Sequence, residues 1–425
     1  MTLKRIGTTV VNADQSFVLG NATPATPVVG MIRWNSATSV FQIYDGTSWT
    51  FIQDTGGSAG ASPTRIGIGL NNVGQLGDGT TTNKSTAIAI VEEFTDWIQI
   101  DTNLRYNTHH TTAIRANGTA WAWGQNNFGQ LGDNSTTNRS SPVSVVGGFT
   151  DWVQISAGGT HTTAIRANGT AWAWGQNNYG QLGDNSTTNR SSPVSVVGGF
   201  TDWIQISAGD NHSLAIRANG TAWGWGENNV GQLGDNSTTY RSSPVSVVGG
   251  FTDWIQISAG QEHSLAIRAN GTAWGWGSSR FGRLGDNTTV SKRSPVAVVG
   301  GFTDWVQISA GTYHSLAIRA NGTAWAWGRN GSGQLGDDST ADRTSPVSVV
   351  GGFTDWIQIS AGDNHSVAIR ANGSAWGWGE NTVGQLGDGV AINDVFKSPV
   401  NIALSSNWVH ISAGCQNTMA IRAVQ

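Results

Sequence analysis

Six histidines occupy one position of a repeated pattern, and a ring of imidazoles could bind a metal ion. They are spaced 51 residues apart, and Asn417 takes the corresponding position in a seventh copy. Equal positions of neighbouring repeats generally lie too far apart to share an ion at bond lengths of about 2.1 Å. We therefore predict structural hydrogen bonds, which the Asn417 amide can also make, and no metal site. The six are His110, His161, His212, His263, His314 and His365.

Arginine and aspartate recur with the same period, and their opposite charges could form charged rings. Seven arginines end an Ala-Ile-Arg triplet, and seven aspartates end a Gly-[Gln/Arg]-Leu-Gly-Asp segment. Pairs within each repeat that hold a loop to a strand are a simpler explanation, although exposed pairs stabilise a fold only weakly. The arginines are Arg115, Arg166, Arg217, Arg268, Arg319, Arg370 and Arg422, and the aspartates are Asp78, Asp133, Asp184, Asp235, Asp286, Asp337 and Asp388. The oxygen-rich stretch 133–136 lacks the acidic spacing and terminal Glu of an EF-hand loop, so we predict no calcium site.

Catalysis usually needs an asymmetric set of reactive side chains, and this sequence contains none that we recognise. There is no unique Ser, His and Asp set, no phosphate-binding G-x-x-x-x-G-K and no H-E-x-x-H. The single cysteine, Cys415, excludes an internal disulfide and a cysteine-cluster metal site. We predict a protein that is not an enzyme and that uses no cofactor.

The composition excludes several other classes of protein. The chain has 425 residues with 58 Gly and 21 Trp and a formal net charge of only −4, which argues against disorder. Without a basic run we expect no nucleic-acid partner, and without a long apolar run we expect no membrane insertion. Residues 1–20 have no apolar core typical of a signal peptide, so we expect no export by that route.

The elements that position these side chains follow from the same period. In each copy we predict four short strands: the run after a Trp, the run that ends at Ala-Ile-Arg, the T-A-W-x-W segment, and P-V-S-V-V. Asn117-Gly118 and its copies join the second and third strands, and Asn-Gly is a strong signal for a two-residue hairpin turn. Four short antiparallel strands in a Gly-rich and aromatic repeat are typical of a propeller blade.

The fold class that we predict is all-β, with a seven-bladed β-propeller over residues 65–425. The two ends of this region are complementary halves of one blade. Strands at 66–69 and 85–91 would supply its third and fourth strands, and strands at 408–412 and 418–422 its first and second. Such a split closing blade of two plus two strands removes the free sheet edges that invite aggregation.

The repeat H-S-L-A-I-R-A-N-G-x-A-W-x-W-G followed by G-Q-L-G-D resembles that of the regulator of chromosome condensation family. The resemblance covers residues 65–425 and implies that family's seven-bladed propeller with a split closing blade. The best-known member exchanges guanine nucleotide on a small nuclear GTPase and binds chromatin. The inserted wedge and basic tail that these activities imply are not found here, and many members of the family serve as binding platforms.

Residues 1–64 lie outside the repeat. We predict an N-terminal arm at 1–29, and at 30–64 a small β-meander that serves as an attachment module and ends in a linker. The run at 30–52 resembles short modules of phage tail-fibre and virion structural proteins, with an I-R-W-N run, a D-G-T turn and a following Trp. Three strands alone are marginal in water. Trp34, Tyr44 and Trp49 therefore need a covering surface, and we predict that they serve attachment or formation of an oligomer such as a trimer.

The copies differ from one another in two places. One is the turn between the first and second strands, with an insertion at 101–109, and the other is the loop between the third and fourth strands, remodelled at 389–397. Because strand direction alternates, both emerge on one face of the ring. Either these loops vary freely, or their aromatic, Arg and amide side chains bind a glycan or a polar protein surface. The candidate binding residues are Arg105, Tyr106, Thr160, Tyr179, Asp210, Asn211, Glu262, Arg280, Phe281, Tyr313, Arg329, Asp363, Asn364, Phe396 and Lys397.

Our leading hypothesis is a non-enzymatic virion protein of the phage tail-fibre, spike or decoration type. Residues 1–64 would bind other virion proteins, and the propeller would recognise a host-surface glycan or protein. Such a protein assembles in the host cytoplasm and resides in the virion. The alternative is a cytoplasmic propeller that acts as a scaffold or as a GTPase regulator of the chromosome condensation regulator type.

Overall fold

The computed structural model describes residues 65–91, 94, 96–106, 108–389, 394–402 and 407–423, together with the backbone of three strands near the N-terminus. The chain divides into two compact units, residues 1–64 with 423–425 and residues 65–422. In the first unit, β1 (Ile32–Asn35), β2 (Val40–Tyr44) and β3 (Trp49–Phe51) form an antiparallel sheet in the order β1-β2-β3. Tyr44 lies opposite Trp49 in the register. These strands match the predicted meander. The arm at 1–29 and the side chains of Trp34, Tyr44 and Trp49 lie outside the described residues, so their roles stay predictions.

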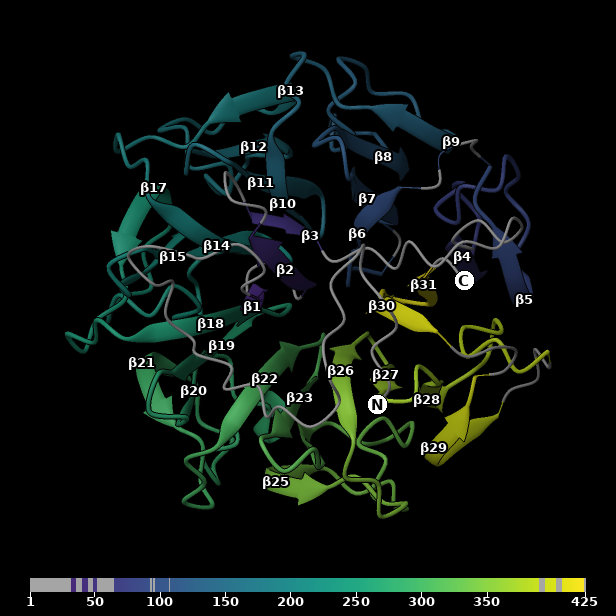
Figure 1. Ribbon diagram of the computed structural model, residues 1–425. Helices are drawn as coiled ribbons and strands as arrows, with labels where there is room; N and C mark the ends of the chain where they lie inside the picture. The colour runs from purple at the N-terminus through teal and green to yellow at the C-terminus, as the bar shows by residue number, and fades with distance from the viewer. Residues whose placement is uncertain are drawn as a thin grey trace. The chain divides into compact units, whose positions relative to one another are not determined.

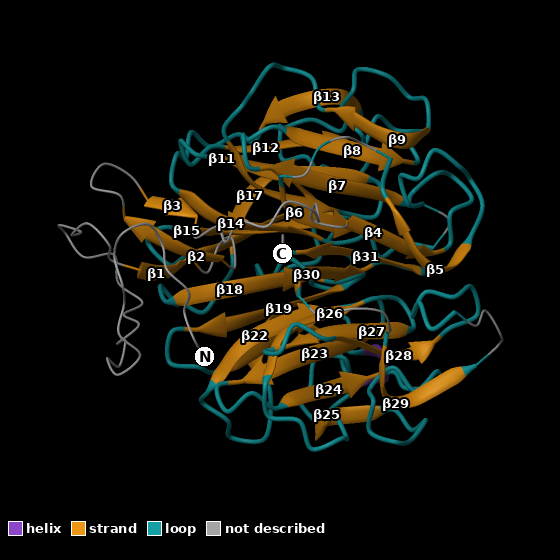
Figure 2. Cartoon of the chain, turned by 45° about the vertical axis from the view of Figure 1, so that its right-hand side comes forward, coloured by secondary structure: helices purple, strands orange, loops and turns teal. Residues whose placement is uncertain are grey.

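Residues 65–422 form a ring of seven four-stranded antiparallel sheets around a central channel (Figure 1), as predicted. Figure 2 shows a blade as a twisted stack of neighbouring strands, for example β6 to β9. Blade 1 consists of β6 (Trp97–Thr102), β7 (His110–Arg115), β8 (Ala120–Gly124) and β9 (Arg139–Ser144). Blade 2 consists of β10 (Trp152–Ala157), β11 (His161–Arg166), β12 (Ala171–Gly175) and β13 (Arg190–Ser195). Blade 3 consists of β14 (Trp203–Ala208), β15 (His212–Arg217), β16 (Ala222–Gly226) and β17 (Arg241–Ser246). Blade 4 consists of β18 (Trp254–Ala259), β19 (His263–Arg268), β20 (Ala273–Gly277) and β21 (Lys292–Ala297). Blade 5 consists of β22 (Trp305–Ala310), β23 (His314–Arg319), β24 (Ala324–Gly328) and β25 (Arg343–Ser348). Blade 6 consists of β26 (Trp356–Ala361), β27 (His365–Arg370), β28 (Ala375–Glu380) and β29 (Val395–Asn401).

The seventh blade joins the two ends of the propeller. Its strands are β30 (Trp408–Ala413), β31 (Asn417–Arg422), β4 (Arg65–Gly69) and β5 (Lys84–Ala89), in the order β30-β31-β4-β5. Asn417 lies opposite Gly69, and Ile421 lies opposite Arg65. The predicted split blade of two plus two strands is therefore confirmed, with strand ends that differ by one or two residues.

The hydrophobic core lies between blades rather than inside them. Leu214 and Ile216 of blade 3 belong to one buried cluster with Trp254, Ile257 and Trp276 of blade 4. Trp276 has no exposed surface, and the same holds for its five equivalents in W-x-W segments. Because each sheet buries its apolar face only against its neighbours, a blade has no core of its own, and we expect the ring to unfold as one unit.

A chain of hydrogen bonds crosses each interface between blades. At the interface of blades 2 and 3, the Ser213 hydroxyl lies 2.9 Å from His161 Nε2 and donates to the Gln181 carbonyl at 2.8 Å. Trp225 Nε1 donates to the same carbonyl at 3.0 Å. Since the single Ser213 proton is used, His161 must carry its proton on Nε2 and donate it to the hydroxyl. The predicted hydrogen-bonding role of the histidines is thereby confirmed. At the last interface Asn417 Nδ2 donates to Thr102 Oγ1 at 3.0 Å.

The recurring charges pair within blades, but with partners other than those expected. Arg166 pairs with Asp151 at 2.8 Å and stacks on Phe149, whose ring centre is 4.0 Å away. Asp133, from the Gly-Gln-Leu-Gly-Asp segment, pairs instead with Arg139 at the start of the fourth strand at 2.8 Å. The register of β10 and β11 explains why Arg166 pairs with Asp151 and not with a loop aspartate. Trp152 lies opposite Arg166, so the end of the second strand lies beside the residue that precedes the first.

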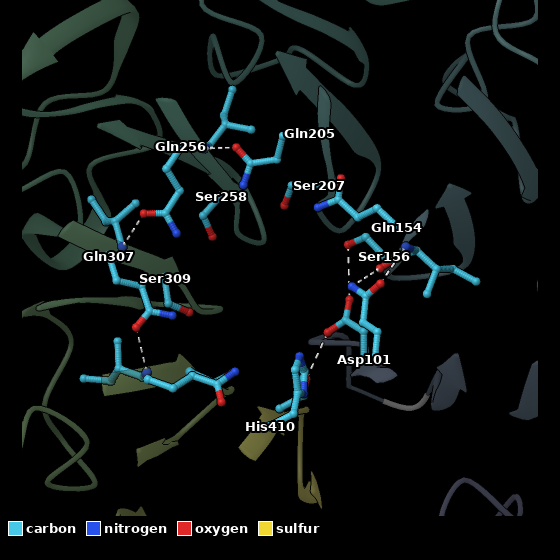
Figure 3. A pocket seen from close by; sticks show the side chains of 18 of the residues that line it. Asp101, Gln154, Ser156, Gln205, Ser207, Gln256, Ser258, Gln307, Ser309 and His410 are labelled. Atoms are coloured by element: carbon cyan, nitrogen blue, oxygen red, sulfur yellow. Dashed lines mark hydrogen bonds between the residues drawn. The ribbon is translucent and has the colours of Figure 1, made fainter. Parts of the chain in front are cut away.

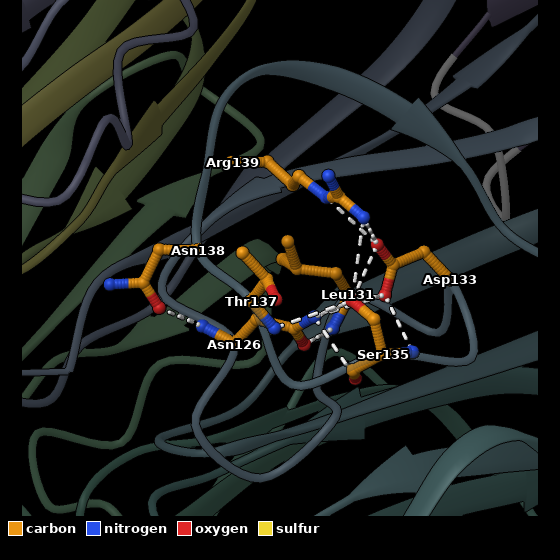
Figure 4. A network of polar contacts seen from close by, with 7 residues as sticks. All are labelled: Asn126, Leu131, Asp133, Ser135, Thr137, Asn138 and Arg139. Carbon is orange, nitrogen blue, oxygen red and sulfur yellow. Dashed lines mark hydrogen bonds and ion pairs between the residues drawn. The ribbon is translucent and has the colours of Figure 1, made fainter.

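The Gly-Gln-Leu-Gly-Asp loop is held by its own polar groups (Figure 4). Asn126 accepts from Leu131 N at 3.0 Å and donates to Asp133 at 2.9 Å. Partial burial raises the pKa of Asp133, but hydrogen bonds from Ser135 and Arg139 outweigh it, and the pKa lies below its ordinary value. The oxygens of this loop are therefore engaged in bonds within the protein.

The buried histidines predict loss of stability in acid. Burial lowers the pKa of His161 to about 3, whereas an unfolded imidazole has a pKa of about 6.5. Below about pH 6.5 the unfolded state binds protons that the folded state does not, which costs about 1.4 kcal/mol per histidine and pH unit. Asp210 and Asp363, whose pKa values burial raises to about 6, oppose this but are fewer. We expect the melting temperature to fall steeply between about pH 7 and pH 5.

A His161→Asn variant provides the matched comparison, because Asn417 already fills this position in the seventh blade. It should show a shallower dependence of melting temperature on pH, measured by calorimetry. An equal slope in both proteins, or a higher melting temperature at the lower pH, would contradict this explanation.

Candidate partner-binding face

The propeller has two faces, and the turns of one face differ between blades more than those of the other. In blade 2, Gln176 N donates to Thr160 O at 2.9 Å, which joins the loop after β12 to the turn after β10. We call the face formed by these turns and loops the variable face. On the opposite, uniform face, Trp203 N of blade 3 donates to Gly169 O at 3.0 Å. A Cβ at Gly169, whose φ is +73°, would lie 2.2 Å from Thr201 O, so its hairpin cannot vary.

The uniform face exposes one aliphatic side chain from most blades. Each is the second residue of the first strand, where a β-bulge interrupts the register, as between Trp152 and Gln154. These exposed residues are Val153, Ile204, Ile255, Val306, Ile357 and Val409. They provide matched positions for testing which face binds a partner.

Glutamine and serine side chains line the central channel, which holds a cavity of about 190 Å³ (Figure 3). Gln205 Oε1 accepts from Ile257 N at 2.9 Å, and Ser207 Oγ accepts from Ala259 N at 3.0 Å. Each side chain thus ties its blade to the next. The oxygen atoms of these side chains therefore bond neighbouring blades to one another.

Two residues break this pattern where blades 7 and 1 meet. Asp101 stands in place of a serine and accepts from Ala157 N and Ser412 Oγ, both at 2.9 Å. His410 stands in place of a glutamine, and burial lowers its pKa to about 4. Burial raises the pKa of Asp101 despite its hydrogen bonds. Both oxygens of Asp101 accept hydrogen bonds, so Asp101 joins blade 1 to blades 2 and 7.

An inserted turn crosses the mouth of the channel on the variable face. Asn103 O accepts from Cys415 N of blade 7 at 2.9 Å, and Leu104 O accepts from Thr312 Oγ1 of blade 5 at 3.0 Å. Arg105 Nη1 lies 3.4 Å from Asp210 Oδ1 of blade 3. We call residues 103–106 the lid. Asn103 Nδ2 also donates to Gly159 O of blade 2 at 3.1 Å, so the lid links blade 1 to four other blades. The Tyr106 side chain is 59% exposed.

Two buried carboxyl groups lie beside the lid. Burial raises the pKa of Asp210 to about 6; Arg105 opposes this shift, and Glu227 and Glu262 reinforce it. Burial also raises the pKa of Asp363 to about 6. Asp210 therefore changes charge near neutral pH while it is in contact with the lid.

A cluster of arginines and aromatic rings occupies blades 4 and 5 of the variable face. The Phe281 and Tyr313 rings meet edge to face with centres 5.8 Å apart. The Arg280 guanidinium lies 4.8 Å from the Phe281 ring centre, and that of Arg329 lies 5.3 Å from the Tyr313 ring centre. Beneath them Arg283 is fully buried and pairs with Glu262 at 2.8 Å.

The structure brings together some of the predicted binding residues and separates others. Arg105, Asp210 and Asn211 meet at the lid, and Arg280, Phe281, Tyr313 and Arg329 form the arginine–aromatic cluster. Tyr179 contacts Tyr240 instead, and Phe396 packs against the core between blades. Thr160, Asn211 and Asp363 are buried, Glu262 and Asn364 are partly exposed, and Lys397 is exposed.

Sequence reasoning missed Asp101, Glu227, Arg283 and His410. Three of them are departures from the repeat inside the conserved segments: Asp for Ser, Arg for Gln and His for Gln. Comparing the strands of the copies, and not only their turns, would have found these. Among the described residues, no group of three or more His, Cys, Asp or Glu could hold a metal ion. No helix in the described part of the chain could cross a membrane.

A closed seven-bladed ring with a split blade and one diversified face defines a class of β-propeller. The RCC1-like domain family matches residues 148–424, and the regulator of chromosome condensation (RCC1) repeat matches residues 117–165. The first match covers more than half of the chain, so the protein belongs to the RCC1-like domain family.

Relatives come from plants, animals and yeast. The chain is 29% identical to the ultraviolet-B receptor UVR8 of Arabidopsis thaliana over 73% of this chain and 72% of the receptor. It is 28% identical to human E3 ubiquitin-protein ligase HERC2 over 78% of this chain but 7% of the ligase. The crystal structure of Prp20p from Saccharomyces cerevisiae, described with its binding to Gsp1p and histones, gives a TM-score of 0.76 at 22% identity. It covers 87% of this chain and 93% of that one. At 22% identity, the likeness to Prp20p shows a shared fold alone.

These relatives do not support the virion hypothesis, and they favour the alternative of an RCC1-like propeller. The family matches begin at residue 117, so they do not bear on the resemblance of residues 30–52 to phage modules.

The lid should loosen when Asp210 is protonated. As the pH falls through about 6, the Asp210 carboxylate loses its charge and its attraction for Arg105. We expect faster hydrogen exchange at residues 103–106 below that pH, after correction for the intrinsic rate. An Asp210→Asn variant should exchange fast at both higher and lower pH.

Asp202→Asn is the matched control, because it removes an ion pair of the same blade on the uniform face. It should leave exchange at the lid unchanged. Exchange that does not respond to pH in the unmodified protein would contradict the assigned role of the Arg105–Asp210 pair.

Proposed function

We propose that the protein is a non-enzymatic binding platform whose variable face recognises a protein partner. The supporting observation is the position of its asymmetry. Apart from Asp101 and His410, the channel and the uniform face repeat from blade to blade, whereas the lid and the arginine–aromatic cluster occur once each and both lie on the variable face. A binding site for one partner needs such asymmetry, because a symmetric ring offers seven equivalent positions.

The composition of this face suits a protein partner. Tyr106 is exposed on the lid, and Phe281 and Tyr313 are partly exposed beside two arginines. Tyr, Phe and Arg are enriched in protein interfaces, and Tyr and Arg supply many of their strongest contacts. The ligase activity of HERC2 and the partners of Prp20p belong to those proteins, and a GTPase is one identity that the partner could have.

The test compares two sets of three substitutions in the full chain. One set is Tyr106→Ala, Phe281→Ala and Tyr313→Ala on the variable face. The other is Ile255→Ala, Val306→Ala and Ile357→Ala on the uniform face, which removes exposed apolar groups in equal number. Each protein is immobilised and used to capture partners from extracts of its source cells, with quantification by mass spectrometry.

We expect the variable-face set to lose the captured partner by about tenfold or more, since each aromatic anchor contributes about 1 kcal/mol or more. The uniform-face set should capture as the unmodified protein does. Loss in the uniform-face set alone would overturn the assignment of the face, and equal capture by all three proteins would overturn the proposal.

A further inference from the structure

The arginine–aromatic cluster has the chemistry of a specific subsite. Resting on the proposed function of the variable face, we propose that Arg280, Phe281, Tyr313 and Arg329 bind an acidic peptide segment of the partner. A carboxylate of the segment would sit between the two guanidinium groups, and an adjacent apolar side chain would contact the Phe281 and Tyr313 rings.

The two outer arginines form no ion pair at contact distance within the described residues. The Ala-Ile-Arg arginines from Arg115 to Arg370 each pair with an aspartate at 2.8 Å. Arg283 pairs with Glu262 at the same distance. Arg280 and Arg329 form no such pair in the described part of the chain, and their guanidinium groups lie against aromatic rings. Arg329 attracts the Asp363 carboxylate only at longer range. The N–H donors of both arginines are free to bind a carboxylate, and charge-assisted bonds of this kind are about twice as strong as neutral ones.

The backbone at Phe281 is unusual among the copies. In the other copies a glutamine accepts a hydrogen bond from the amide two residues earlier, as Gln181 Oε1 does from Tyr179 N at 2.9 Å. Arg283 replaces that glutamine and has no acceptor. The segment instead closes as a 3-10 turn, η1 (Arg280–Gly282), and Phe281 adopts a φ of 63°.

This conformation brings Phe281 to the next blade. Arg283 Nη1 donates to Thr312 O of blade 5 at 2.7 Å, which holds the two blades together beneath the cluster. The Phe281 ring then meets Tyr313 edge to face. A left-handed conformation costs a residue other than glycine about 1 kcal/mol or more, and such strain is concentrated at functional sites.

The surrounding charges favour a short acidic segment over an extended polyanion. Glu227 and Glu262 lie on one side of the cluster, in blades 3 and 4, and Asp363 and Glu380 lie on the other, in blade 6. The chain as a whole carries a formal charge of −4. A nucleic-acid backbone would meet these carboxylates, whereas a segment with one or two acidic residues fits between them.

The experiment measures binding of a fluorescein-labelled peptide of alternating Glu and Phe to the full chain by fluorescence anisotropy. The same peptide with Gln in place of Glu is the probe control. We expect the Arg280→Ala, Arg329→Ala double variant to bind the acidic peptide about tenfold more weakly or worse, which corresponds to about 1.4 kcal/mol. The Arg293→Ala variant should bind as the unmodified protein does, because Arg293 is exposed on β21 away from the cluster.

Two further results separate this inference from the proposed function. Arg283→Gln restores the repeat residue and should weaken peptide binding because Phe281 loses its conformation. Equal binding of the Glu and Gln peptides, or full binding by the double variant, would overturn the acidic subsite. If partner capture still depended on Tyr106, Phe281 and Tyr313, the proposed function would stand while this inference failed.

Discussion

The propeller depends on a hydrogen-bonded chain at its blade interfaces. From the interface of blades 1 and 2 to that of blades 5 and 6, a histidine, a hydroxyl, a backbone carbonyl and an indole are linked in order. At the two interfaces of the split blade, Asn417 replaces the histidine and Ile68 replaces the indole. Three of the four linked groups are fully buried side chains, such as His161, Ser213 and Trp225. A buried polar group without a partner costs more than a formed bond contributes. The chain therefore fixes the distance and angle between blades, while the apolar clusters supply the driving force. It also requires a neutral imidazole, which makes the ring sensitive to acid.

This constraint determines where the molecule can vary. The channel glutamines and serines, the Asn-Gly hairpins and the paired arginines all connect one strand or blade to another, so a substitution there removes one of these connections. Fewer residues in the turns and loops of the variable face form such connections between strands or blades. There the insertion at 101–109 became a lid across the channel, and the replacement of a glutamine by Arg283 rebuilt the loop around Phe281.

The fold could be predicted because it rests on periodic signals. The 51-residue spacing, the Asn-Gly hairpins and the complementary ends predict seven blades and a split closing blade, and the structure agrees. The site could be predicted only as a face. The bond from Thr312 to Leu104 joins residues 208 positions apart, and no local pattern encodes it. The pairing of Arg166 with Asp151 depended on the register of two strands, and the turn at Phe281 depended on a bond that Arg283 cannot accept.

We propose that the variable face alone recognises a partner. Hydroxyl-radical footprinting of the full chain, free and bound to its captured partner, tests this claim directly because it reads side-chain exposure on both faces at once. The account predicts protection of Tyr106, Phe281 and Tyr313, with Ile255, Val306 and Ile357 as reactive as in the free protein. Protection of Ile255, Val306 and Ile357 without change at the three aromatic residues would contradict it.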